Sequence, residues 1–209
     1  MSTEQTSQLA LKRGGRSKAL HAQHGLPDPL DHAMDRYAEG DDSAFGELAR
    51  GLTPRLSAFL VRLSGSREHA DDLTQETFLR IHRARGSFAR GSGVVPWAYA
   101  IARNCFISHA RTKKTRLSRN TVDVSAIEVA TGPDVNAEAT FAARQSADIV
   151  SKTLAAMPVA NREAFVLIRY EGMSVATAAQ LVGISEGALK LRAFRAYEML
   201  RAALKEPAS

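Results

Sequence analysis

Apolar residues recur at intervals of three and four along two long parts of the chain, and this spacing is typical of helices that share a core. The first part begins near Leu30, after a polar segment with few large apolar residues. Glycine and proline residues divide this part into separate helices. We expect Gly65 to end one helix and Pro54 and Pro96 to open two others. The pattern predicts a compact helical domain over residues 30–113.

One predicted helix, capped by Ser66, has an unusual outer face. Its inward face is apolar, as expected, but the opposite face carries Asp72, Glu76 and Leu79 in succession. An apolar side chain between a carboxylate pair and the basic Arg83 favours a docking stripe. The simpler alternative is a solvated helix face, because single exposed leucines are common.

Charge is distributed unevenly along the chain. The formal net charge is +6, yet residues 77–122 contain ten Lys or Arg and no Asp or Glu, so the remainder is net acidic. Such a one-signed segment attracts a polyanion. The same segment places glycines around Phe88 and aromatic residues at Trp97 and Tyr99. Glycine-rich backbone beside aromatic and arginine side chains is suited to holding unstacked bases.

The second apolar part ends in the pattern of a helix-turn-helix. We expect Asn161 to cap one helix and Ser185 to cap the long last one. A helix-turn-helix needs a small residue where the helices cross, a glycine at the turn and an apolar residue that seats the second helix. Ala179, Gly183 and Leu189 meet these needs. An ordinary helical hairpin with solvated charges remains the alternative.

Composition narrows the remaining possibilities. A chain of 209 residues with 44% apolar residues has room for one large or two small domains. The single cysteine, Cys105, excludes internal disulfides and a cysteine-based zinc site, which fits a reducing cytosol. It shares a helical face with Trp97 and Ile101, so a buried thiol is the simpler interpretation. Neither a membrane span nor a secretion signal is visible, and we expect a cytoplasmic protein without membrane insertion.

The sequence therefore predicts an all-α fold of two small helical domains. A mobile polar arm spans 1–29, the first domain spans 30–113, a linker spans 114–138 and the helix-turn-helix domain spans 139–209. The linker is recognised by fading periodicity and by its Ser, Thr, Gly, Pro and Asn residues. A tether of this length lets the two domains, each binding DNA weakly, bind two separated DNA elements at the same time.

Two blocks of this sequence resemble a known family. DDLTQETFLR at 71–80, with Trp97 and IARN at 101–104, is similar to region 2 of the extracytoplasmic-function (ECF) group of bacterial sigma factors. The segments at 154–158, 162–163, 170–174 and 183–192 are similar to region 4 of that group. Two matching blocks in this order, with no third domain between them, make the resemblance specific. It does not cover the arm or the linker.

The resemblance implies a non-enzymatic protein without a cofactor or metal. Such a protein binds core RNA polymerase at its clamp helices and flap, recognises promoter DNA and is commonly held by an anti-sigma factor. It nucleates strand opening by capturing an extruded base, which shifts the duplex toward the open form.

The resemblance also assigns residues to three contacts. The polymerase-binding face is Asp71, Asp72, Gln75, Glu76 and Leu79. The contacts with the downstream (−10) element are Ser87, Arg90, Ser92, Arg103, Asn104 and Arg111. The contacts with the upstream (−35) element are Ser185, Glu186, Lys190, Arg192 and Arg195.

Two departures from the family pattern affect these assignments. Ala188, Leu191 and Phe194 stand where family members commonly carry Thr, Ser and His, so the upstream sequence preference does not transfer. The loop at 87–93 is less polar than usual, which leaves the base-capturing side chain open among its serines and arginine.

Two other functions are compatible with parts of the sequence. A metal-dependent nuclease would use His69, Asp71, Asp72, Glu76 and His82, but a single helix does not gather them and no second ligand cluster follows. A stand-alone helix-turn-helix regulator would bind duplex DNA without polymerase. That function leaves the acidic face and the glycine loop without a role. A pull-down with core polymerase distinguishes a stand-alone regulator from a sigma factor.

Overall fold

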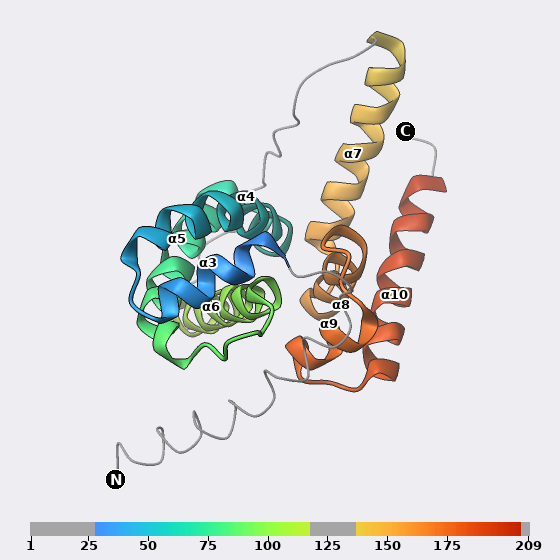
Figure 1. Ribbon diagram of the computed structural model, residues 1–209. Coiled ribbons are helices and arrows are strands. Elements are labelled where there is room, and N and C mark those ends of the chain that lie inside the picture. Colours follow the sequence, from blue (N-terminus) through green and yellow to red (C-terminus); the bar gives the residue numbers. More distant parts are fainter. Residues whose placement is uncertain (1–27, 118–136, 206–209) are drawn as a thin grey trace.

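The computed structural model describes residues 28–117 and 137–205, with side chains for 28–112 and 146–205. Its helices form two groups that pack against each other, and the described residues contain no strand (Figure 1). The first group comprises α3 (Pro29–Ala38), α4 (Phe45–Ser64), α5 (Arg67–Ala84) and α6 (Val94–Leu117), with short 3-10 turns η2 (Asp42–Ala44) and η3 (Arg85–Ser87). The second comprises α7 (Ala137–Ala156), α8 (Val159–Phe165), the π-helical η4 (Val166–Tyr170), α9 (Val175–Val182) and α10 (Glu186–Lys205). The all-α prediction is confirmed.

Helix α4 is the central element of the first group, and it corrects one prediction. Pro54 was expected to open a new helix, but it lies inside the continuous α4. Its ring is exposed, whereas Leu52 and Leu56 on either side are fully buried. An internal proline costs about 3 kcal/mol. Burying each leucine of the stripe returns about 1.5–3 kcal/mol, so the buried stripe keeps the helix continuous.

Gly51 on α4 faces the Leu30 side chain of α3. A Cβ atom at this position would lie 2.6 Å from Cδ2 of Leu30, so a larger residue would require the Leu30 side chain to move.

The helix ends predicted at Gly65 and Ser66 are confirmed, because Gly65 adopts φ 73° and the Ser66 Oγ accepts a hydrogen bond from the His69 amide. The turn at Gly65 and the cap at Ser66 fix where α5 begins. Pro96 was expected to open a helix, but α6 begins two residues earlier, at Val94.

The second group contains the expected helix-turn-helix in α9 and α10. Gly183 turns the chain with φ 80°, and the buried Ala179 and Leu189 lie at the crossing. Ser185 caps α10 by accepting a hydrogen bond from the Ala188 amide at 3.2 Å. These predictions are confirmed.

The expected cap at Asn161 is wrong. Helix α8 begins earlier, at Val159, with Pro158 in the capping position. The Pro158 carbonyl accepts hydrogen bonds from the amides of Asn161 and Arg162 at 2.9 and 3.1 Å, which closes the first turn. Proline needs no partner for a missing amide proton, so it suits this end of a helix.

None of the described helices is long and apolar enough to cross a membrane.

Candidate protein and nucleic-acid interfaces

The outer face of α5 presents the residues predicted to bind polymerase. Asp71, Asp72, Gln75 and Leu79 are exposed, and Glu76 is half-buried. The Leu79 side chain is 52% exposed, although it is a large apolar residue. The Glu76 Oε1 accepts a hydrogen bond from Nε of Arg80 at 2.7 Å. The face therefore combines an acidic rim with one unburied leucine, as the sequence indicated.

The opposite face of α5 holds this surface in place. Ala70, Thr77 and Ile81 are completely buried. The Thr77 hydroxyl donates to the Leu73 carbonyl at 2.6 Å, so its burial leaves no unpaired polar group. The orientation of the acidic face thus follows from packing that a surface substitution does not disturb.

The glycine loop at 87–93 is anchored at both ends. At its start, Phe88 is buried and its ring lies 5.1 Å from that of Trp97 in an edge-on arrangement. Past the exposed Gly91, which has φ 67°, Ser92 is buried with 2% exposure. Arg90 is exposed and its guanidinium lies 2.5 Å from a carboxylate oxygen of Glu39 on the chain just after α3. The loop is thus a fixed turn with its tip outward.

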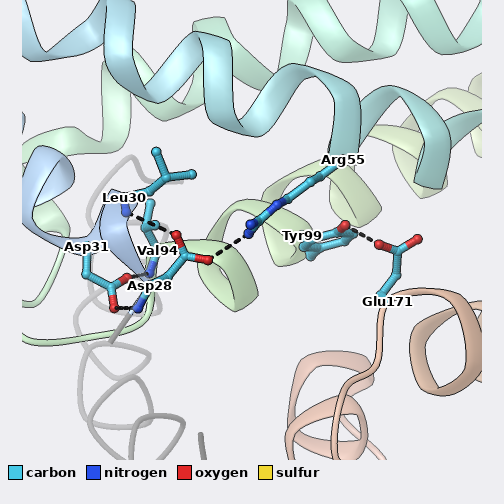
Figure 2. Close-up of polar contacts among 7 residues, drawn as sticks. All are labelled: Asp28, Leu30, Asp31, Arg55, Val94, Tyr99 and Glu171. Atoms are coloured by element: carbon cyan, nitrogen blue, oxygen red, sulfur yellow. Dashed lines mark hydrogen bonds and ion pairs between the residues drawn. The ribbon is translucent and has the colours of Figure 1, made fainter. Parts of the chain in front are cut away.

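A carboxylate of α3 fixes the end of this loop. The Val94 amide, at the start of α6, donates a hydrogen bond to Oδ1 of Asp31 at 2.8 Å (Figure 2). The other oxygen of Asp31 accepts from the Asp28 amide at 3.1 Å. The bond between Val94 and Asp31 connects residues 63 positions apart in the sequence. Because the loop is held at both ends, the cost of ordering it when a ligand binds is reduced, which favours affinity.

Asp28 extends the same network to α4. Its carboxylate caps α3 by accepting from the Leu30 amide, and Nη1 of Arg55 lies 2.7 Å from its Oδ2 (Figure 2). Burial alone raises the pKa of Asp28, but the hydrogen bonds from Arg55 and Leu30 outweigh it and hold the pKa below its usual value. The charged form of Asp28 is thus the form that the fold favours.

The six residues predicted to contact the −10 element differ in how exposed they are. Ser87 and Arg90 are exposed at the loop, whereas Ser92 is buried. Asn104 and Arg111 are exposed on α6. Arg103 is different, because its side chain is only 17% exposed and is engaged by the second group of helices.

The two groups of helices meet across a polar interface. The Nε of Arg103 on α6 lies 2.5 Å from Oε1 of Glu163 on α8, and Nη2 lies 3.3 Å from Oε2. Glu163 is nearly fully buried, at 6% exposed. The bidentate pairing occupies an arginine that the sequence assigned to DNA. In this closed arrangement, Arg103 is not available to a nucleic acid.

A second polar contact joins the groups nearby. The Tyr99 hydroxyl on α6 donates a hydrogen bond to the Glu171 carboxylate that follows η4 (Figure 2). Nη1 of Arg62 lies 3.5 Å from the same carboxylate, and its guanidinium lies 4.3 Å from the ring centroid of Tyr170. Burial raises the pKa of Glu171 despite the opposing effects of Tyr99 and Arg62. Burial and the Glu171 hydrogen bond also raise the pKa of Tyr99, which keeps the phenol protonated as the donor.

Helix α10 presents a basic surface along its first turns. Ser185, Glu186, Lys190 and Arg195 are exposed and Arg192 is half-buried. Lys190, Arg192 and Arg195 form no hydrogen bond or ion pair with any residue that the structure describes. Unneutralised cations on the second helix of a helix-turn-helix are suited to phosphate contacts.

The metal-nuclease alternative finds no support in the described residues, since they contain no group of three or more His, Cys, Asp or Glu that is placed to hold a metal ion. Nδ1 of His82 lies 2.6 Å from the Tyr37 hydroxyl, and the His69 ring instead lies 5.9 Å from that of His109. The five candidate ligands are thus not gathered at one point.

The polar interface is the functional feature that the sequence did not identify. Glu163 and Glu171 belong to motifs that resemble a family, but nothing in their spacing shows that they pair with Arg103 and Tyr99. The sequence likewise did not indicate the role of Asp31. The only sequence signal was that residues 77–122, which include Arg103, contain no Asp or Glu. A counterion for Arg103 therefore has to come from another part of the chain.

Comparison with known proteins identifies two matching family models. Residues 48–116 match the model of Sigma-70 region 2, and residues 147–200 match that of Sigma-70 region 4. The chain is 35% identical over 176 residues to the RNA polymerase sigma factor CarQ of Myxococcus xanthus, covering 83% of this chain and 96% of that protein. It is 33% identical over 175 residues to the ECF RNA polymerase sigma factor SigF of Caulobacter vibrioides, covering 82% and 91%.

Solved structures agree with these matches. The sigma factor RpoE of Bartonella quintana, in complex with the anti-sigma factor NepR, superposes with a TM-score of 0.68 at 27% identity. That match covers 78% of this chain and 98% of the other. CnrH, in complex with the cytosolic domain of CnrY, superposes with a TM-score of 0.63 at 24% identity and shares the fold.

Proposed function

Because the chain belongs to the ECF group of bacterial RNA polymerase sigma factors, and so binds the polymerase and directs it to promoters, we propose that three of its surfaces divide this work. Sigma factors act as initiation factors without enzymatic activity, and a stand-alone regulator is set aside. The finer assignment is that α5 binds the polymerase clamp helices, the loop at 87–93 captures an extruded base and α10 reads the upstream element. The protein works in the cytoplasm, where its polymerase is.

The observation that carries this assignment is the outer face of α5. Leu79 is 52% exposed although neighbouring apolar positions of α5 are buried. An exposed leucine beside Asp72 and Glu76 offers both apolar area and charge complementarity to a basic protein surface. Because α5 packs firmly on α4 and α6, this face is preorganised for a rigid partner.

The anchored loop supports the role in strand opening. Unstacking one base costs a few kcal/mol, and a preformed pocket that accepts only the extruded base shifts the duplex toward opening. The Asp31 and Phe88 anchors hold the backbone on either side of the exposed tip. Ser87 and Arg90 are the exposed candidates for the contact with the base, whereas the buried Ser92 suits a structural role in the turn.

The closed arrangement implies a step before DNA binding. Arg103 engages Glu163 at 2.5 Å, so tracking the −10 DNA with Arg103 requires the two groups of helices to separate. The similar RpoE structure contains an anti-sigma factor, and an anti-sigma partner is proposed for this chain as well. Such a partner would compete with polymerase for the acidic face of α5.

Run-off transcription tests the proposal. Core polymerase is mixed with the purified full chain and genomic fragments from the source organism, and transcript starts are mapped. The expected result is initiation at a limited set of sites that share two elements upstream of the start. Failure to initiate at any fragment, with a chain that is folded by circular dichroism, would contradict the proposed function.

A further inference from the structure

The first turns of α10 carry two exposed apolar side chains among the cations. Leu191 is 49% exposed and Phe194 is 60% exposed, although Leu189 and Ala196 on the inner face of the same helix are completely buried. Residues three apart lie on one face of a helix, so Leu191 and Phe194 form a single apolar strip. The seating of α10 does not depend on this strip.

The charges beside the strip indicate its ligand. Lys190 precedes Leu191 and Arg195 follows Phe194, and neither cation has an acidic partner among the residues that the structure describes. A protein partner with an apolar patch would not by itself require these free cations. A DNA major groove supplies both features, because phosphates line its edges and each thymine places a 5-methyl group on its floor.

We propose that Leu191 and Phe194 read thymine methyl groups in the upstream promoter element, with Lys190 and Arg195 contacting the flanking phosphates. This inference rests on the proposed role of α10 and specifies its chemistry. Apolar contact with the thymine methyl is an established form of direct readout, in which cytosine at the same position lacks the methyl. Specificity then arises from apolar contact between these side chains and the thymine methyl, whereas a polar side chain at the same position would form hydrogen bonds to the base.

The size of the effect follows from the burial of one methyl group. Removing a buried methyl is worth about 0.8 kcal/mol, which corresponds to about fourfold in affinity. Replacing thymine by deoxyuridine removes only this methyl and leaves base pairing unchanged. Wild-type holoenzyme is therefore expected to bind deoxyuridine-substituted DNA about fourfold more weakly at one or two upstream positions.

The test starts from DNA selected by the holoenzyme out of a pool with a randomised upstream segment. Thymine is expected at one or two positions on either strand, and each is then replaced by deoxyuridine in a synthetic promoter. The variant that carries both Leu191→Ser and Phe194→Ser should bind thymine and deoxyuridine DNA equally. Lys190→Ala is the matched control, since it should weaken both equally and keep their ratio.

Several results would overturn the inference. These are selected upstream segments without thymine, equal binding of both DNAs by the wild type, or an unchanged ratio in the serine variant. A serine variant that binds DNA normally but loses an anti-sigma protein would show that the strip binds protein instead. Failure of the proposed function is distinguishable, because the holoenzyme would then select no sequence and give no run-off transcript.

Discussion

The two groups of helices bury their apolar side chains to different extents. In the first group, α3 to α6, Leu79 is the one large apolar side chain among the described residues that is counted as exposed. In the second group, α7 to α10, seven are exposed among residues 146–205: Val159, Tyr170, Leu191, Phe194, Tyr197, Met199 and Leu204. The first group is thus a scaffold that presents charges and a fixed loop. The second group leaves more apolar side chains exposed, so its own surface is available to a partner.

The difference follows from the length and arrangement of the helices. Helix α4 extends the buried stripe from Leu48 to Leu63 and is covered by α3, α5 and α6. In the second group, α10 continues to Lys205 with α7 and α8 as its main neighbours. A helix covered on one side only must leave its other side to solvent or to a partner. The exposed side chains of the second group are therefore the surface that a partner can contact.

A substitution in the core of the first group is expected to have the largest effect. Phe59→Ala should lower the free energy of unfolding by about 3–5 kcal/mol. The substitution removes a fully buried ring whose centroid lies 4.8 Å from the centroid of the Tyr99 ring. Tyr197→Ala, which changes a 55% exposed ring on α10, should change the free energy of unfolding by less than about 0.5 kcal/mol. Urea unfolding of the full chain measures both. Similar losses for the two variants would remove the distinction between the groups.

The contact between the groups is expected to have the next largest effect. Glu163→Gln leaves the mostly buried Arg103 without its counterion and should weaken the closed arrangement by about 2–3 kcal/mol. Small-angle X-ray scattering should then report a larger radius of gyration. Glu198→Gln is the control, since its pairing with Arg201 at 3.6 Å is exposed. An unchanged radius for Glu163→Gln would show that the ion pair does not hold the groups together.

Removing the free cations sharpens the account of the second group. Lys190→Ala with Arg195→Ala should weaken promoter binding by the holoenzyme about tenfold or more, and should reduce the salt dependence by about two phosphate contacts. Thermal unfolding should not change, because both side chains are exposed. Arg201→Ala is a suitable comparison on the same helix. Unchanged promoter occupancy in the double variant would refute the assignment of α10.

A smaller effect is expected at the anchored loop. Asp31→Ala removes the acceptor for the Val94 amide and should slow open-complex formation several-fold, at a cost of about 1 kcal/mol. Asp31→Asn keeps an acceptor oxygen and should be closer to the wild type. Permanganate reactivity of unpaired thymines measures opening, while polymerase affinity should stay constant. Equal opening rates for all three proteins would show that the anchor has no role.

Local signals allowed much of the fold to be predicted. Gly65, Ser66, Gly183 and Ser185 each act through hydrogen bonds or dihedral angles within a few residues, and the structure confirms all four. The exposure of Leu79 also followed from helical period alone. The roles of the three surfaces depended on a family resemblance and stay predictions.

The errors and omissions arise where tertiary contacts outweigh local preference. Pro54 is a helix breaker by local rules, but a buried stripe on both sides of it keeps α4 continuous. Arg103 and Glu163 are 60 positions apart, so no local pattern shows that they pair. The hydrogen bond between Asp31 and Val94 was missed for the same reason. Such contacts become visible only once the helices are packed.

The most direct test of the account measures how core polymerase binds a chain with a reversed α5 face. Asp72→Lys with Glu76→Lys should reduce the affinity by about a hundredfold or more, because the two lysines would face the basic partner surface and repel it. Asp42→Lys with Glu47→Lys makes the same charge change on exposed residues elsewhere and should bind normally. Wild-type affinity in the first variant, with its melting temperature unchanged, would contradict the central claim that this face binds polymerase.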